Sequence, residues 1–199
     1  MCQHSINDTS RALAFSPAKA SETQEDFAML KNGKSDESTI TSILTKWIMQ
    51  QDWEEAIEDE FELEKSTFRR CILVNDQPFQ MFFEADEPNR WLSVYAYGPI
   101  KVTPSRMGEM TRLLNNINLR LTIGRLACVD DDDANPVQYR ARISLNGGTL
   151  AAQQIDDLAL AAWRICTIYG PIISRVALTK VTTKECWADL LQDEAAGRK

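Results

Sequence analysis

Chemically reactive residues are scarce in this sequence. Its single histidine, His4, lies close to the first residue of the chain. A Ser-His-Asp triad or a typical zinc site needs an imidazole held rigidly beside its partners, so both kinds of site are disfavoured. The chain also lacks a P-loop, a G-x-G-x-x-G loop and an H-E-x-x-H motif. We therefore expect a protein that is not an enzyme and that has no cofactor and no metal site.

Long apolar runs are missing as well. No stretch approaches the roughly 20 residues that a membrane-spanning helix needs, and the first residues lack the basic and apolar regions of a signal peptide. The five cysteines are widely spaced and form no C-x-x-C pair, which disfavours disulfide or redox chemistry. The net charge of −7 argues against binding to nucleic acid or to an anionic membrane. We expect a cytoplasmic location.

Composition and periodicity divide the chain into three parts. Residues 1–36 are rich in polar residues without sustained periodicity, which predicts a flexible N-terminal tail. Residues 37–178 hold the periodic segments of one folded domain, and the hydrophobic fraction of 44% in the whole chain suffices for a core. Residues 179–199 predict a C-terminal helix and tail.

Apolar spacings of three and four residues predict helices. The expected helices cover residues 38–51, a segment from Pro104 to about Leu121, a long segment capped by Thr149, and 182–195. Gly170-Pro171 should end the long helix near Tyr169. Residues 172–178 are ambiguous, and we prefer a second helical segment after that break. Trp187, Leu190 and Leu191 should anchor the last helix.

Alternating apolar residues predict strands. The expected strands are 67–75, 78–85, 90–97, 121–129 and 137–145, and short turns rich in Asn, Asp and Pro join the first three. Closely spaced strands with such turns favour an antiparallel sheet. The fold class is therefore α+β, a two-layer sandwich of an antiparallel sheet with helices packed on it.

The strands carry more aromatic side chains than one core face can take. Successive residues of a strand point to opposite faces, so the neighbours Phe82 and Phe83 cannot share a core. Some aromatic surface should then remain for a helix, a second subunit or a peptide, although packing beneath two helices could also consume it. The candidate partner-binding residues on the strands are Phe83, Trp91, Tyr95 and Tyr97.

Two stretches are strongly acidic. Residues 52–64 hold eight carboxylates and no basic residue, and we favour a solvated edge strand over an acid–base or cation site. Asp130–Asp133 is the best metal candidate. A calcium loop beginning at Asp131 would place Pro136 where the turning glycine belongs, so an unliganded hairpin tip is preferred. A metal-dependent enzyme or regulator that uses Asp130–Asp133 is the alternative function.

Basic residues gather between Lys101 and Arg125, against the acidic residues 52–64. This separation of basic and acidic segments predicts an isologous dimer or a charged partner, with Arg112 and Arg120 as candidate contacts. Ordinary pairing within the chain explains the pattern equally well. A nucleic-acid binder that uses residues 106–125 is disfavoured by the overall charge.

One motif resembles a known family. Leu113-Leu114-Asn115-Asn116-Ile117-Asn118, followed by Gly124-Arg125-Leu126, is similar to the LLN-x-hydrophobic-N and G-R-hydrophobic core of the YbjN family, described as bacterial sensory transduction regulators. The resemblance extends from about Ile40 to Tyr169. It implies a fold similar to type III secretion chaperones, and it supplies no catalytic residues. The implied function is a regulatory or chaperone-like module that binds a protein or peptide partner as a homodimer.

Overall fold

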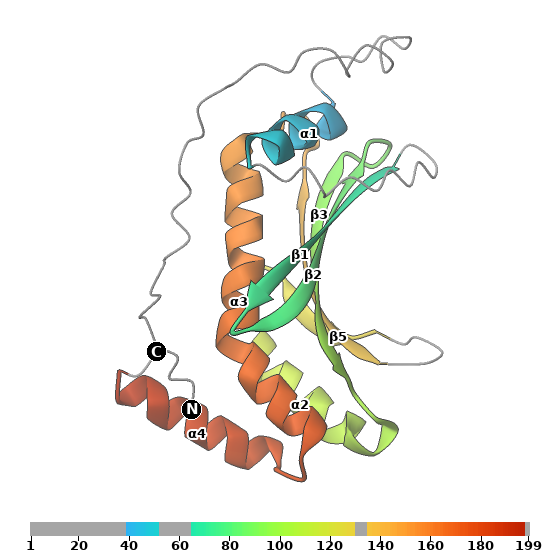
Figure 1. The fold of residues 1–199 in the computed structure, drawn as a ribbon. Helices are drawn as coiled ribbons and strands as arrows, with labels where there is room; N and C mark the ends of the chain where they lie inside the picture. The colour runs from blue at the N-terminus through green and yellow to red at the C-terminus, as the bar shows by residue number, and fades with distance from the viewer. Residues whose placement is uncertain (1–38, 52–64, 130–134, 198–199) are drawn as a thin grey trace, which may run out of the picture. The chain divides into compact units, whose positions relative to one another are not determined.

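The computed structural model describes residues 39–51, 65–129 and 135–197. The expected N-terminal tail, the expected acidic strand at residues 52–64 and the acidic turn Asp130–Asp133 all lie outside these residues. The three-part division of the chain therefore stays a prediction. The described residues form one unit of helices and strands (Figure 1).

Five strands make one sheet: β1 (Lys65–Val74), β2 (Gln77–Asp86), β3 (Trp91–Lys101), β4 (Arg125–Cys128) and β5 (Pro136–Ser144). Their order across the sheet is β1-β2-β3-β5-β4, and every neighbouring pair is antiparallel. Asn75 and Asp76, at φ 50° and 60°, join β1 to β2 in a two-residue turn of the type that hairpins prefer. The expected strands are confirmed, with boundaries shifted by a few residues.

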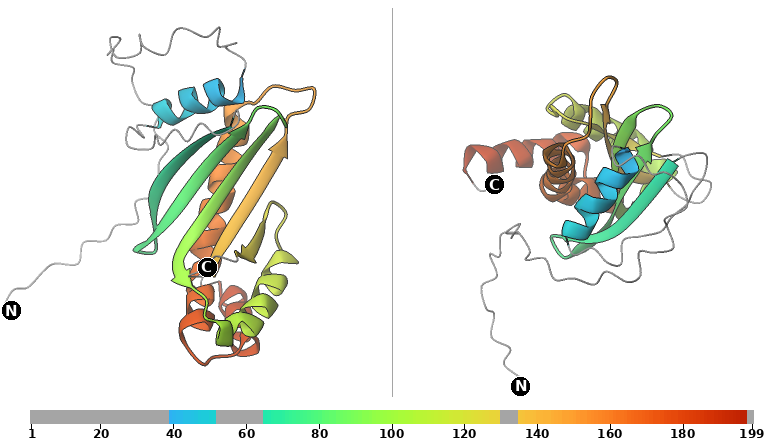
Figure 2. Two further views of the ribbon diagram at one scale, coloured as in Figure 1. Left: turned by 90° about the vertical axis from the view of Figure 1, so that its right-hand side faces the viewer. Right: turned by 90° about the horizontal axis from the view of Figure 1, so that it is seen from above.

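The helices are α1 (Ile40–Gln50), α2 (Met107–Asn118), α3 (Ala152–Leu178) and α4 (Thr183–Ala195), and a 3₁₀ turn, η2 (Pro104–Arg106), precedes α2. The left view of Figure 2 faces the sheet from the side opposite α3, which runs behind the strands. The fold is thus an α+β arrangement of an antiparallel sheet with helices packed on it. No helix of the described ranges is long and apolar enough to cross a membrane.

The core lies between α3 and the sheet. Alternate strand residues enter it, including Met81 and Phe83 from β2, Leu92 and Val94 from β3, and Tyr139 from β5. Apolar residues of α3 meet them, among them Ile155 and Ala162. Period-two alternation in the strands and the apolar stripe of α3 thus face each other, which explains why these segments fold together.

The long helix differs from its prediction in two ways. It begins at Ala152, where the side chain of Gln154 accepts a hydrogen bond from the N–H of Ala151 at 2.9 Å, and Thr149 is not its cap. It also continues through Gly170-Pro171 to Leu178, so the expected helix end near Tyr169 is wrong. Pro171 has no N–H, which leaves the Thr167 carbonyl without its usual helical donor. The Asn75 side chain donates to that carbonyl instead, at 3.1 Å.

The last helix begins as expected, with Thr182 as its cap and Glu185 completing a capping box. Its anchor differs slightly from the prediction. Leu190 is buried and Trp187 is half-buried, whereas Leu191 is 46% exposed. Cys186 takes the buried position in its place, because it lies one helical turn before Leu190.

The motif that resembles the YbjN core forms a corner between α2 and β4. Asn118 at the end of α2 accepts a hydrogen bond from the N–H of Leu126 at 2.8 Å and donates to its carbonyl at 2.9 Å. Gly124 has a φ of 73°, and a Cβ placed there would lie 2.5 Å from the Tyr139 hydroxyl. These motif residues therefore have a structural role, because they hold the start of β4 against the end of α2 and against β5.

Candidate partner-binding face

The side of the sheet that faces away from α3, here called the outer face, gathers the polar and aromatic half of each strand. Strand register places Tyr95 beside Phe82 on β2 and beside Arg140 on β5, and it places Ser93 between Glu84 and Arg142. Trp91 and Tyr97 lie on the same face of β3, since they are an even number of residues from Tyr95. None of the described helices covers this face (Figure 2, left).

Trp91 forms the first of two arginine–aromatic pairs on the outer face. The guanidinium carbon of Arg142 lies 4.2 Å from the Trp91 ring centre, within the range of a cation–π interaction. The Nε of Arg142 donates to the Ser93 hydroxyl at 2.8 Å, and a terminal nitrogen lies 3.9 Å from a Glu84 carboxylate oxygen. Arg142 is therefore held in place on three sides, and its charge is partly neutralised.

Tyr95 forms the second pair. The guanidinium carbon of Arg140 lies 5.2 Å from the Tyr95 ring centre. The Tyr95 hydroxyl donates to Glu84 at 3.2 Å, so the same carboxylate contacts both pairs. Arg140 itself has no carboxylate within ion-pair distance among the residues that the structure describes. Its charge is available to a partner at the surface.

Tyr97 is the third aromatic residue of β3 on the outer face, after Trp91 and Tyr95. Its ring meets the edge of the Phe82 ring with centres 5.5 Å apart, and the side chain of Gln138 donates to its hydroxyl. Burial raises the pKa of Tyr97 above the ordinary tyrosine value, and the hydrogen bond from Gln138 offsets only part of that effect. The hydroxyl therefore stays protonated at neutral pH and acts as a neutral contact group.

Phe83 does not belong to this face. It is 1% exposed and lies in the core, where its ring centre is 5.3 Å from that of Trp47 on α1. Its strand partners Phe68 and Val94 are also buried, which identifies the inner side of the sheet. A partner cannot reach Phe83 without displacing α1, so its proposed role at a surface is corrected. Phe82, on the opposite side, takes the surface position.

Arg112 and Arg120 are also placed away from the outer face, because both lie on or just after α2. Arg112 pairs with Glu109 at 2.5 Å. Arg120 donates to both carboxylate oxygens of Glu194 on α4, at 3.1 and 2.9 Å, and that pairing raises its pKa. The structure thus uses both arginines within the chain, which was the open alternative to a partner contact.

Arg140, Arg142 and Glu84 are members of the site that the sequence reasoning did not select. A local signal for two of them exists. Val137, Tyr139 and Ala141 alternate as core residues, so Arg140 and Arg142 must point to the other face of the same strand. Their pairing with Tyr95 and Trp91 depends on the register of β3 with β5, which no local pattern reveals.

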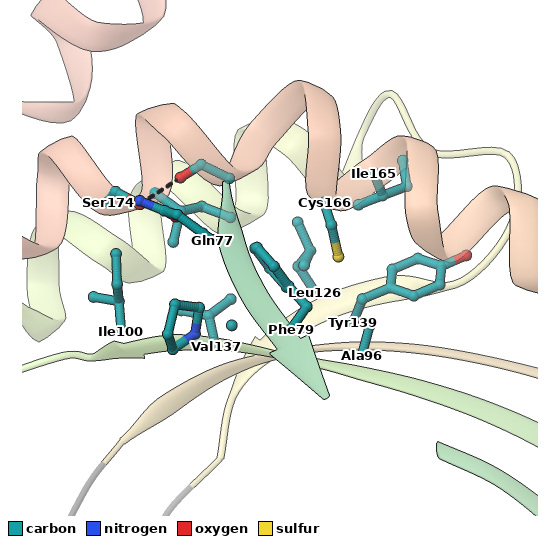
Figure 3. Close-up of a pocket in the computed structure, with 14 residues that line it drawn as sticks. Gln77, Phe79, Ala96, Ile100, Leu126, Val137, Tyr139, Ile165, Cys166 and Ser174 are labelled. Atoms are coloured by element: carbon teal, nitrogen blue, oxygen red, sulfur yellow. Dashed lines mark hydrogen bonds between the residues drawn. The ribbon is translucent and has the colours of Figure 1, made fainter. Parts of the chain in front are cut away.

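A small cavity lies on the other side of the sheet, beneath α3. Its volume of about 20 Å³ is enough for one water molecule, and its lining is mostly apolar. Figure 3 shows the sulfur of Cys166 pointing from α3 toward the sheet. Burial raises the pKa of this thiol to about 12, which makes it a poor nucleophile. The cavity is therefore a packing gap too small for a metabolite.

Metal binding finds no support in the described part of the chain. No group of three or more His, Cys, Asp or Glu side chains is arranged there to hold a metal ion. Asp130–Asp133 lie outside that part, so the acidic turn is untested. The outer face is consequently the surface of the described residues with the clearest binding chemistry.

The solved structures that are similar to this chain include two crystal structures. The crystal structure of YbjN, "a putative transcription regulator from E. coli", is 14% identical, with a TM-score of 0.47, over 66% of this chain and 91% of that one. The crystal structure of an uncharacterized protein from Methanothermobacter thermautotrophicus is 13% identical, with a TM-score of 0.42, over 69% and 98%.

No curated protein matches the chain. A family model does, and it covers most of the described domain. Residues 41–167 match the model of the YbjN family, whose description is "Putative bacterial sensory transduction regulator". That range runs from α1 into α3 and includes the whole sheet together with the corner formed by Asn118 and Leu126. The chain therefore belongs to the YbjN family.

Proposed function

We propose that this protein is a non-catalytic regulatory or chaperone-like module that holds a protein or peptide partner on the outer face of its sheet. The observation that carries the proposal is the row Trp91, Tyr95 and Tyr97, with two arginines stacked against it and none of the described helices over it. Membership of a family of regulators supports a binding role.

The chemistry of the row suits a protein interface. Aromatic and arginine side chains dominate the residues that contribute most to protein–protein affinity. On the outer face they are already ordered by contacts with one another, such as the hydrogen bond from Arg142 to Ser93. A partner would then meet side chains that lose little further conformational freedom on binding, which lowers the cost of association.

The same proposal includes a homodimer in the cytoplasm and no nucleic-acid or membrane partner. An isologous dimer would place one surface of the chain against its own copy around a twofold axis. Light scattering coupled to size-exclusion chromatography measures this directly. A mass equal to two chains supports the homodimer, and a mass equal to one chain at all concentrations tested contradicts it.

Site-specific photo-crosslinking tests the binding face. Tyr95 is replaced by p-benzoylphenylalanine, which keeps an aromatic side chain at the centre of the row, and the full chain is irradiated in cells of its native host. Arg164, exposed on the opposite side on α3, carries the same group in the control. We expect discrete crosslinked products only from position 95, identified by mass spectrometry.

The crosslinks also show which kind of partner is present. Products that contain a second polypeptide support the outer face as a binding surface, and products of two copies of this chain identify the dimer interface. Equal crosslinking from positions 95 and 164, or none from position 95, would contradict the proposal.

A further inference from the structure

We propose that the segment held on the outer face is acidic, with Arg125 and Arg140 binding the Asp or Glu carboxylates of an extended segment of another protein. This inference rests on the proposed function and names the chemistry of its partner. It follows from where the charges of the described residues lie and from how the two guanidinium groups are held.

Charge is distributed unevenly along the chain. The five strands of the sheet carry seven Lys and Arg against two Asp and Glu, although the whole chain has a net charge of −7. Much of the negative charge belongs to residues 52–64, which hold eight carboxylates, and to Asp130–Asp133. The sheet is thus basic, and a partner with complementary charge on this face is acidic.

Strands β4 and β5 bring Arg125, Arg140 and Arg142 to the outer face. Arg125 and Arg140 are directly opposite each other in the β4–β5 pair. Like charges at directly opposite positions destabilise a sheet, so this pair is unfavourable by itself. In the described residues, neither arginine has a carboxylate within 4.0 Å, whereas the neighbouring Arg142 has Glu84. A carboxylate bound between Arg125 and Arg140 would relieve that repulsion.

The stacking of Arg140 on Tyr95 prepares it for such a ligand. A guanidinium that lies over a ring at 5.2 Å keeps the N–H groups along its edges for hydrogen bonding. Carboxylates match that planar fork with two parallel hydrogen bonds. The ring therefore orients the arginine while leaving its recognition groups available.

The same stacking argues against single-stranded nucleic acid as the occupant. Proteins that read single strands on a sheet stack the bases on exposed aromatic rings. Here Arg142 and Arg140 cover one face of Trp91 and of Tyr95, at 4.2 and 5.2 Å. Base stacking would have to displace both guanidinium groups from these rings.

Fluorescence anisotropy with three labelled probes tests the inference on the full chain. The first probe is a 14-residue peptide of Asp and Glu with two leucines, the second has Asn and Gln at every acidic position, and the third is a 14-nucleotide oligothymidylate. Each is titrated with the wild type and with Arg125→Gln, Arg140→Gln and Arg164→Gln. The last variant removes the same charge from the solvent side of α3.

The expected result is tightest binding of the acidic peptide. Each of Arg125→Gln and Arg140→Gln should weaken it about fivefold, the upper range for an exposed ion pair, and Arg164→Gln less than about twofold. Equal binding of the acidic and neutral peptides, weakened by Tyr95→Ser, would overturn the acidic preference and keep the outer face as a peptide site. If neither peptide binds, both the acidic preference and the role of the outer face as a peptide site are overturned. If the oligonucleotide binds more tightly than the acidic peptide, the ligand of this face is nucleic acid and the inference is overturned.

A second copy of this chain is the remaining occupant, since its residues 52–64 are acidic. Self-association is followed by light scattering of the wild type and of a variant with Gln and Asn at all eight acidic positions. A dimer that dissociates in that variant and in Arg140→Gln would show that the face is filled by its own copy, which would overturn a partner from another protein.

Discussion

The side-chain amide of Asn75 donates to the carbonyl of Thr167 at 3.1 Å, the carbonyl that Pro171 deprives of its donor in the helix. The turn between β1 and β2 thereby replaces a missing helical hydrogen bond in α3. A proline within a helix interior is ordinarily unfavourable by about 3 kcal/mol, partly because of that lost bond. Here the loss is compensated by a residue 92 positions earlier in the chain.

A double-mutant cycle tests this compensation. Asn75→Gly keeps the positive φ of the turn and removes the amide, so it should lower the free energy of unfolding by about 1 kcal/mol. In a Pro171→Ala background the Thr167 carbonyl regains its helical donor, and the same substitution should have a smaller effect. Urea unfolding measures both, with Asp76→Gly as the control for the turn. Equal effects of Asn75→Gly in the two backgrounds would show that the contact is unimportant.

Gly124 is expected to tolerate no side chain. Its φ of 73° disfavours any other residue by about 1–2 kcal/mol, and a Cβ would lie 2.7 Å from the Arg140 carbonyl oxygen. Gly147 has a similar φ of 77° with open space around it, which makes Gly147→Ala a matched control. Thermal unfolding should show a much larger loss for Gly124→Ala. Similar losses for the two variants would mean that the contact with β5 is not tight.

Asp86 should make stability depend on acid pH. Its side chain is 2% exposed, and burial alone would raise its pKa. Hydrogen bonds from the backbone N–H and the side-chain amide of Asn89, together with the Lys65 ammonium at 3.2 Å, outweigh burial and lower the pKa below 3.8. The stability that the carboxylate contributes is therefore present above about pH 4 and is lost as the pH falls through the lowered value.

Asp86→Asn, compared with the wild type by urea unfolding from pH 7 to pH 3, measures that contribution. At pH 7 the substitution should lower the free energy of unfolding by about 1–3 kcal/mol. The difference between the two proteins should shrink below about pH 4. Asp76→Asn, in an exposed turn, serves as the control, and a difference that stays constant down to pH 3 would contradict the assignment.

Two cysteines should differ strongly in reactivity. Cys71 is exposed on β1, whereas Cys166 is buried with its pKa raised to about 12 by that burial. At pH 8 the Cys166 thiolate is then on the order of one part in ten thousand, and the reagent must also reach it. A short pulse of N-ethylmaleimide, mapped by mass spectrometry, should label Cys71 in the native protein and Cys166 only in urea. Native labelling of Cys166 would indicate an opening of α3.

Local patterns were sufficient for the strands and for most of the helices. Alternation in β2 required Phe82 and Phe83 to face opposite ways, and the structure places one on each side of the sheet. Which of the two enters the core depends on the packing of α1 and α3, so the sequence alone selected the wrong one. The helix break expected at Gly170-Pro171 failed for a related reason, because the compensating Asn75 lies on a distant turn.

The candidate site needed information that local patterns lack. Trp91, Tyr95 and Tyr97 share a face because of strand geometry, which the sequence predicts. Arg140 lies beside them only because of the register of β5 with β3. Arg120 is no longer a candidate contact because it pairs with Glu194, 74 residues later. Contacts of this kind depend on tertiary packing. The distribution of charged residues along the sequence therefore indicated that arginines are available for binding, but it did not show which of them lie together on one face.

The sheet is basic whereas the whole chain has a net charge of −7, and this difference in sign has a consequence for the effect of ionic strength on binding. Repulsion of an anionic ligand by the whole chain acts over long distances, which added salt screens first, since the Debye length is about 10 Å at 0.1 M. Direct contacts with Arg125 and Arg140 are shorter and weaken later. Affinity for an acidic ligand should accordingly pass through a maximum as salt is raised from millimolar concentrations, in place of the steady decline expected of a uniformly basic protein.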